Sequence, residues 1–168
     1  MNRRLQEVYN KSPVISFDSS SRIVLMSDCH RGQGTEGDNF LKNQNLFLGA
    51  LEYYNHRGFI YIELGDGDEL WENRKIESIT EAHSEAFGLM SRFYRENRFF
   101  MIYGNHDIVK QRPSFILKRC SQYYCYSRNS CVPLFPGICV SEGLILENPC
   151  LKRRIFLVHG HQGSLLND

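Results

Sequence analysis

Four short clusters of residues suited to metal binding each follow an apolar run of the sequence. The clusters are Asp28-Cys29-His30, Gly65-Asp66-Gly67-Asp68-Glu69, Gly104-Asn105-His106-Asp107 and His159-Gly160-His161. Their carboxylates, imidazoles and amide form a mixed oxygen and nitrogen set, which suits Mn, Fe, Zn or Co better than an all-oxygen calcium site or a thiolate site. Alone, Asp66 could cap a turn, Asn105 could occupy a left-handed backbone position and His159 could be a core histidine. Their recurrence at four strand ends predicts a metal site.

The residues between the clusters predict the elements that would bring them together. Apolar runs at 23–26, 59–64, 99–103 and 155–158 read as strands, and two stretches carry apolar side chains at helical spacing, 38–57 and 78–97. Strands that alternate with helices imply right-handed crossovers and a sheet of parallel strands. Ligands of such a sheet gather beyond the carboxyl ends of its strands. We therefore predict an α/β fold in which the four clusters converge.

The remaining segments carry weaker patterns. Short helices are predicted at 1–11 and 114–124. A further strand is predicted at 144–147, before the one at 155–158. Residues 125–141 show no clear period. Two strands joined by a hairpin are predicted at 14–17 and 23–26. The second of them is apolar throughout, so we expect it to be buried at the centre of a sheet.

Composition excludes several classes of protein. The 168-residue chain has 20 Lys and Arg against 19 Asp and Glu, so it lacks the positive charge of nucleic-acid and anionic-membrane binders. No apolar run is long enough to span a bilayer, and the first residues lack the apolar segment of a signal peptide, so we expect a cytoplasmic protein. The six cysteines include no Cys-x-x-Cys pair, which favours reduced thiols. Cys29 is predicted to be a small buried residue that points away from Asp28 and His30.

The order of the motifs resembles that of the calcineurin-like metallophosphoesterases. That family's pattern is Asp-x-His, Gly-Asp-x-x-Asp/Glu, Gly-Asn-His-Asp/Glu, a His after a strand and a closing Gly-His-x-His, and the first three match here. The segment Gly65-Asp66-x-x-Glu69-Leu70-Trp71 resembles the branch that contains the UDP-diacylglucosamine hydrolases. The resemblance covers Ile23 to His161 and implies a four-layer αββα sandwich, formed by a single domain over residues 1–168.

The resemblance also implies a metal-dependent phosphoesterase and assigns its ligands. Asp28 and His30 would bind a first divalent metal ion, Asn105 and His159 a second, and Asp66 would bridge the two. Manganese is favoured, with Fe, Zn, Co or Mg as alternatives. In this family the two ions hold a hydroxide that attacks phosphorus. The substrate would be a small-molecule phosphomonoester, phosphodiester or pyrophosphate.

Further residues are candidates for catalysis and substrate binding. By the same resemblance, His106 would lie beside the phosphate, where it can donate to an oxygen or protonate the leaving group, and Asp107 would orient its imidazole. Asn105 would contact the substrate as well as the metal. Arg31, next to the first cluster, could bind a substrate phosphate through its forked donors, with a solvated loop arginine as the alternative.

The closing motif of the family is absent, because Gly163 stands where a second histidine would follow His161. We therefore expect a domain truncated before this motif, or a degenerate member with weak catalysis. Two alternatives to the dinuclear enzyme stay open: a non-catalytic interaction module of the same fold, and a mononuclear metal hydrolase that uses Asp28, His30 and Asp66. An uncovered sheet edge and apolar face would favour self-association into a homo-oligomer.

Overall fold

A parallel sheet of four strands forms the centre of the computed structural model, which describes residues 3–125 and 128–163. In spatial order the strands are β2 (Ile23–Met26), β3 (Ile60–Leu64), β4 (Phe99–Ile102) and β7 (Val140–Ser141). Side chains alternate across the sheet, so in β3 Tyr61 packs on one face and Ile62 on the other. The parallel pairing places the carboxyl ends of β2, β3 and β4 at one edge, as the alternation of strands and helices predicts.

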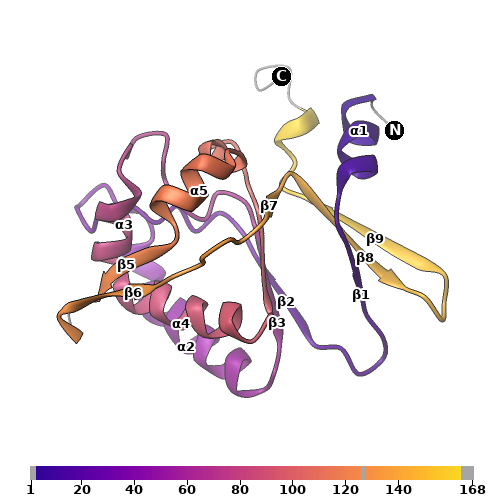
Figure 1. Ribbon diagram of the computed structural model, residues 1–168, viewed down its shortest axis with the longest axis horizontal. Helices are drawn as coiled ribbons and strands as arrows, with labels where there is room; N and C mark the ends of the chain where they lie inside the picture. Colours follow the sequence, from indigo (N-terminus) through magenta and orange to yellow (C-terminus); the bar gives the residue numbers. More distant parts are fainter. Residues whose placement is uncertain (1–2, 126–127, 164–168) are drawn as a thin grey trace.

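A smaller sheet packs against the first one. Its strands are β1 (Val14–Ser16), β8 (Gly143–Asn148) and β9 (Arg153–Val158). β1 pairs with β8 in parallel, and β8 pairs with β9 antiparallel (Figure 1). One buried apolar cluster lies between the two sheets, formed by Ile62, Ile102, Leu144, Leu146 and Leu157. Burial of these side chains is what holds the sheets face to face.

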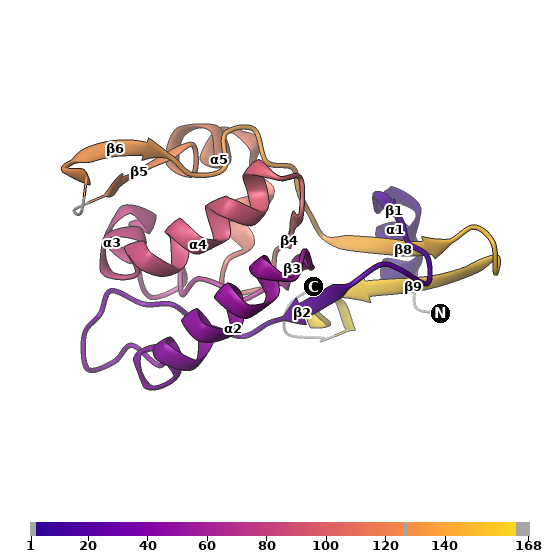
Figure 2. The same ribbon diagram turned by 90° about the horizontal axis from the view of Figure 1, so that it is seen from below.

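Helices cover the outer faces of both sheets. The α-helices are α1 (Arg3–Lys11), α2 (Gln44–His56), α3 (Ile76–Ala82), α4 (Ser84–Arg95) and α5 (Pro113–Arg119). Short 3₁₀ helices are η1 (Leu41–Asn43), η2 (Ile108–Gln111) and η4 (His161–Gly163), and β5 (Gln122–Cys125) with β6 (Ser130–Pro133) forms a hairpin. α2 and α4 pack on the parallel sheet through a large apolar cluster, and α1 packs on β8 through the buried Val8 (Figure 2). The layers run helix, sheet, sheet, helix, which confirms the expected α/β fold with αββα layers.

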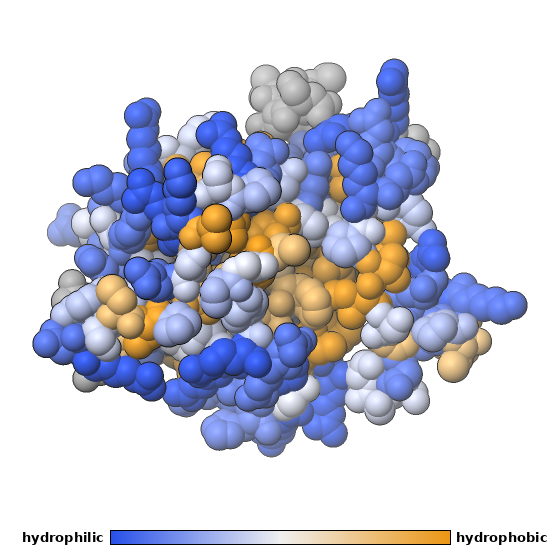
Figure 3. All heavy atoms as spheres, in the orientation of Figure 1, coloured by the Kyte–Doolittle hydropathy of each residue, from blue (hydrophilic) through white to orange (hydrophobic). Residues whose placement is uncertain are grey.

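One face of the molecule carries an apolar area. Figure 3 shows apolar side chains gathered in the middle of this face, between the two groups of strands, with hydrophilic residues around them. β2 lies at the edge of the parallel sheet opposite to β7, away from this face (Figure 2), and its Leu25 is 43% exposed. Self-association through an uncovered sheet edge and an apolar sheet face stays a prediction. No helix among the described residues has both the length and the apolar character needed to cross a membrane.

The expected hairpin between 14–17 and 23–26 is wrong. β1 and β2 belong to different sheets, because β1 pairs with β8 and β2 pairs with β3. β2 is consequently an edge strand, whereas its apolar sequence predicted a central one. Pairing with strands that come later in the chain overrides the local hairpin pattern.

Two predicted helices are also shorter than expected. The stretch 78–97 is divided at His83, a residue that is buried and whose Nε2 lies 2.7 Å from Asp38 Oδ2. The helix predicted over 114–124 ends at Arg119, and the residues after it form β5, which pairs with β6. Contacts with distant residues decide these boundaries.

Candidate metal centre

The loops after β3 and β4 approach each other closely at the carboxyl edge of the parallel sheet. Gly65 has a φ of +89°, and a Cβ on it would lie 2.7 Å from the backbone nitrogen of Gly104. A Cβ on Gly104 would lie 2.1 Å from Asp66 Oδ1. Only glycine fits at both positions, so these residues allow Asp66 and His106 to share one site.

Asp28, Asp66 and His159 form one group of candidate metal ligands. One ligand atom from each lies within 4.8 Å of the others. His159 donates from Nδ1 to the carbonyl oxygen of Leu64 at 2.9 Å, since a carbonyl can only accept, and Nε2 is left to face Asp66 Oδ2 at 3.1 Å. His30 Nε2 lies 3.9 Å from an oxygen of Asp28 and 3.9 Å from one of Asp66. The clusters that follow β2, β3 and β9 therefore lie together.

Hydrogen bonds keep the central carboxylate of this group ionised. Burial opposes the charge on Asp66, but hydrogen bonds from His159 and from the backbone N–H of His106 outweigh it and hold the pKa of Asp66 below its usual value. The hydrogen bond to Asp66 in turn raises the pKa of His159. Ionised carboxylates beside imidazoles are ligands that Mn, Fe, Zn and Co accept, so the donor set fits a divalent transition metal.

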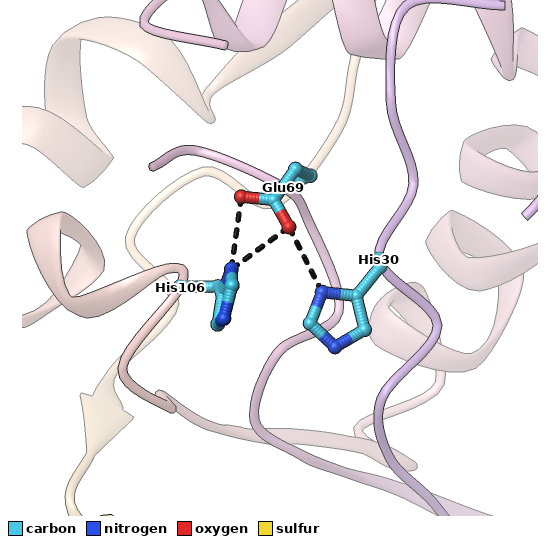
Figure 4. Close-up of side chains that lie close together, drawn as sticks. All are labelled: His30, Glu69 and His106. Carbon is cyan, nitrogen blue, oxygen red and sulfur yellow. Dashed lines mark hydrogen bonds and ion pairs between the residues drawn. The ribbon is translucent and has the colours of Figure 1, made fainter. Parts of the chain in front are cut away.

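A second group consists of His30, Glu69 and His106, which face one another in Figure 4. Glu69 Oε2 lies 3.0 Å from His30 Nδ1 and 2.8 Å from His106 Nδ1. A carboxylate only accepts, so both imidazoles donate from Nδ1 and keep Nε2 for other partners. Burial opposes the charge on Glu69, but the hydrogen bonds from the two histidines lower its pKa. Glu69 thus fixes the tautomer and the orientation of both rings.

Three of the candidate residues have left-handed backbone conformations. The φ angle is +54° at Asp28, +47° at His30 and +50° at Asp66. Such angles cost on the order of 1–3 kcal/mol for residues other than glycine, and they cluster at functional sites. Hydrogen bonds between the loops compensate, because the N–H of Asp28 donates to the carbonyl of Gly65 and the N–H of His30 to that of Asp66.

A network of buried charges lies behind these loops. Its members, each at most 2% exposed, are Arg31, Glu63, Asp68, Asp107 and Lys110. Lys110 Nζ lies 2.7 Å from Asp68 Oδ2 and 2.8 Å from Asp107 Oδ2. Arg31 contacts Asp68 at 2.7 Å and Glu63 at 2.9 Å. Burial opposes the charge on Asp68, but Arg31 and Lys110 lower its pKa to about 2, so the pairs remain ionised.

Asp107 and Arg31 belong to this network. The sequence instead predicts that Asp107 orients the ring of His106 and that Arg31 binds a substrate phosphate. Asp107 Oδ1 accepts from the backbone N–H of Gly104 at 2.7 Å and from that of Asp66 at 3.3 Å. Asp107 therefore holds the two loops together. The residue that contacts the ring of His106 is Glu69, where Asp107 was expected. Arg31 is completely buried against Glu63 and Asp68, so its guanidinium is not available to a substrate phosphate.

Replacing Lys110 by Met is expected to lower the free energy of unfolding by about 3 to 5 kcal/mol, because Asp68 and Asp107 would keep buried charges without their partner. Urea denaturation followed by circular dichroism measures the loss. Arg119→Met is the matched control, since Arg119 pairs with Glu77 at the exposed surface and its removal should cost no more than about 1 kcal/mol. Equal losses in the two variants would contradict a structural role for the network.

Cys29 lies between two candidate ligands but packs against the large apolar cluster. Burial raises the pKa of its thiol to about 11, and burial raises that of Cys120 to about 12. At about pH 8, a disulfide reagent such as DTNB is therefore expected to modify the exposed Cys131, Cys139 and Cys150 first, and Cys29 and Cys120 only after unfolding. Peptide mapping by mass spectrometry measures the order, and labelling of Cys29 as fast as Cys139 would refute it.

Asn105 is half-buried and lines the same cavity as His106, in the loop after β4. The ring of His161 lies 5.7 Å from that of His159. Sequence reasoning missed Glu63 and Lys110, and it assigned no role to Asp68 and Glu69 of the second cluster. The one available signal was Glu63, a charged residue in an otherwise apolar strand.

Comparison with known protein families identifies the family of this chain. The family model described as calcineurin-like phosphoesterase matches residues 21–167, a range that contains both groups of candidate ligands. Searches of curated proteins and of solved structures return no match. The resemblance to the branch of UDP-diacylglucosamine hydrolases stays a prediction. The extent of the family match, together with the site at the carboxyl edge of the sheet, leads to the conclusion that this chain belongs to the calcineurin-like phosphoesterase family.

Proposed function

We propose that this protein hydrolyses phosphoesters with the help of two divalent metal ions at the candidate metal centre. Its family carries out metal-dependent phosphoester hydrolysis in general. The observation that supports the proposal most directly is the position of Asp28, Asp66 and His159 beside the group of His30, Glu69 and His106.

In this proposal Asp28, His30 and Asp66 hold one ion, and Asp66, Asn105 and His159 hold the other. Asp66 Oδ2 faces both His159 Nε2, at 3.1 Å, and His30 Nε2, at 3.9 Å, which supports its role as the shared ligand. Divalent ions bound there, with manganese favoured, would polarise the phosphate and lower the pKa of a water molecule.

His106 is the side chain that we propose as the general acid. Its Nδ1 is held by Glu69, so Nε2 is the atom that can donate to a phosphate oxygen or to the leaving oxygen. Glu69 keeps a lowered pKa and therefore stays ionised near neutral pH, where it holds the ring of His106 in one orientation. Asp107 acts indirectly in this scheme, by bracing the loops that carry Asp66 and His106.

The test is hydrolysis of p-nitrophenyl phosphate and of bis-p-nitrophenyl phosphate by the purified chain with added Mn²⁺. We expect turnover that a chelator abolishes and that fresh Mn²⁺ restores. The double variant Asp28→Asn, His159→Ala, purified in the same way, controls for contaminating phosphatases. Absence of turnover with each of Mn, Fe, Zn, Co and Mg would contradict the proposal.

Elemental analysis of the metal-loaded protein separates the alternatives. Two ions per chain agree with the dinuclear enzyme. One ion with turnover favours the mononuclear hydrolase that uses Asp28, His30 and Asp66. Bound metal without turnover on either ester favours a non-catalytic interaction module.

A further inference from the structure

A cavity of about 260 Å³ is lined by His106 but not by His30 or Glu69. Its lining residues are Leu70, Trp71, Asn105, His106, Ile108, Val109 and His161. Trp71 and His106 meet edge to face, with ring centroids 4.7 Å apart. The cavity therefore shares Asn105 and His106 with the candidate metal centre, and a ligand in it would adjoin a phosphate bound beside His106.

The lining of this cavity is mostly apolar and carries no lysine, arginine or carboxylate. Trp71 is 64% exposed and Ile108 is 43% exposed, although both are large apolar side chains. Exposed aromatic and aliphatic side chains beside a polar site are typical of ligand-binding surfaces. Apart from its two imidazoles, of which His106 is assigned to the phosphate beside the metal centre, the lining offers no cation to a second phosphate or a carboxylate, so the cavity favours an uncharged group.

The size and the polar atoms of the cavity narrow the ligand further. A cavity of about 150 Å³ is enough to hold benzene, so this one accommodates a single ring or a fused pair of rings. Asn105 and His106 provide hydrogen-bonding groups at the edge towards the metal centre. His161 is buried, and its Nδ1 has no hydrogen-bond partner among the described residues.

We propose that this cavity binds the group esterified to the phosphate, and that this group is an uncharged planar ring system packed against Trp71. This inference rests on the proposed phosphoesterase function. It names the substrate class as aryl phosphoesters, in preference to esters of small polar alcohols. Trp71 and Ile108 are then specificity-determining residues.

Phenylphosphonate and methylphosphonate test this directly, because they carry the same phosphonate group and their carbon–phosphorus bonds resist hydrolysis. Isothermal titration calorimetry of the Mn²⁺-loaded protein is expected to show about tenfold tighter binding of phenylphosphonate. Trp71 is the only tryptophan of the chain, so phenylphosphonate should also change the tryptophan fluorescence, and methylphosphonate should change it less.

In variants we follow the ratio of the affinity for phenylphosphonate to that for methylphosphonate. Effects on binding of the shared phosphonate group cancel in this ratio. We expect Trp71→Ala to bring the ratio close to one and Ile108→Ala to lower it about threefold. Tyr53→Ala is the matched control, since Tyr53 is an exposed aromatic side chain on α2 that does not line the cavity, and it should keep the wild-type ratio.

Two failures of the experiment are distinguishable. The inference that the cavity binds a ring is contradicted if the wild type binds both phosphonates equally. It is also contradicted if Trp71→Ala and Ile108→Ala keep the wild-type ratio of affinities. In either case the proposed phosphoesterase function is unaffected. Absence of Mn²⁺-dependent binding of both phosphonates, together with absence of turnover, overturns the proposed function and this inference with it.

Discussion

Asp66→Asn is expected to reduce metal binding more than any other single substitution. Asp66 is the only residue proposed to contact both ions, and its charge offsets part of the charge of each. Changes to residues that only support a ligand cost about 10- to 100-fold in metal affinity, so loss of the shared carboxylate should exceed 100-fold. Asn keeps an oxygen that can accept from the backbone N–H of His106, so the fold should survive. Metal titration followed by elemental analysis measures the effect.

Two further variants make this result interpretable. Asp28→Asn should weaken metal binding less than Asp66→Asn, because Asp28 is proposed to contact one ion only. Asp18→Asn should leave metal content unchanged, since Asp18 caps the turn between β1 and β2 through hydrogen bonds from Ser20 and Ser21. If Asp66→Asn kept the wild-type metal content while Asp28→Asn lost it, Asp66 would not be the bridging residue.

His106→Ala is expected to slow hydrolysis by about 10² to 10⁴, the contribution typical of a general acid, while metal content stays at the wild-type level. The reason is that the proposal assigns His106 to neither ion and gives its Nε2 to proton donation, while Glu69 holds its Nδ1. Steady-state kinetics on p-nitrophenyl phosphate, with elemental analysis of the same preparations, measures both quantities. Loss of metal from His106→Ala would make His106 a ligand instead.

His56→Ala is the matched control for that variant, because His56 lies exposed at the end of α2 and should leave the rate unchanged. Glu69→Gln tests the orienting contact. A glutamine is uncharged and accepts through one oxygen only, so it would hold the Nδ1 atoms of His30 and His106 less firmly than the carboxylate does. We expect an intermediate loss of rate, about 10- to 100-fold. A wild-type rate in Glu69→Gln would show that the contact has no part in the chemistry.

The position of the site could be predicted from the sequence, and the physical reason is general. Parallel strands bring their carboxyl ends to one edge, so residues that follow β2, β3 and β4 had to lie near one another. The glycines of the motifs carried further information, since Gly65 and Gly104 permit the close approach of their loops.

Side-chain contacts between residues far apart in the chain could not be predicted from the sequence. Arg31 follows a metal-binding motif and precedes a glycine-containing loop, which suggests exposure, yet Glu63 from β3 and Asp68 from the next loop enclose it. Asp107 adjoins His106 in sequence, but its carboxylate turns to Lys110 and to the backbone of the neighbouring loop. Sequence adjacency does not determine the direction of a side chain in a tight turn.

The pairing of β1 with β8 has a consequence for synthesis of the chain. Val14 lies opposite Ile145, so β1 leaves the ribosome roughly 130 residues before its partner. At translation rates of roughly 5–20 residues per second the delay is roughly 7 to 26 s, long compared with the folding of local helices. Once β4 has emerged, we expect the face of the parallel sheet that β8 and β9 later cover to remain in contact with water until those strands follow. We therefore expect the nascent chain to be a substrate for chaperones that bind apolar strands, and its release from them to follow the emergence of the β8–β9 hairpin.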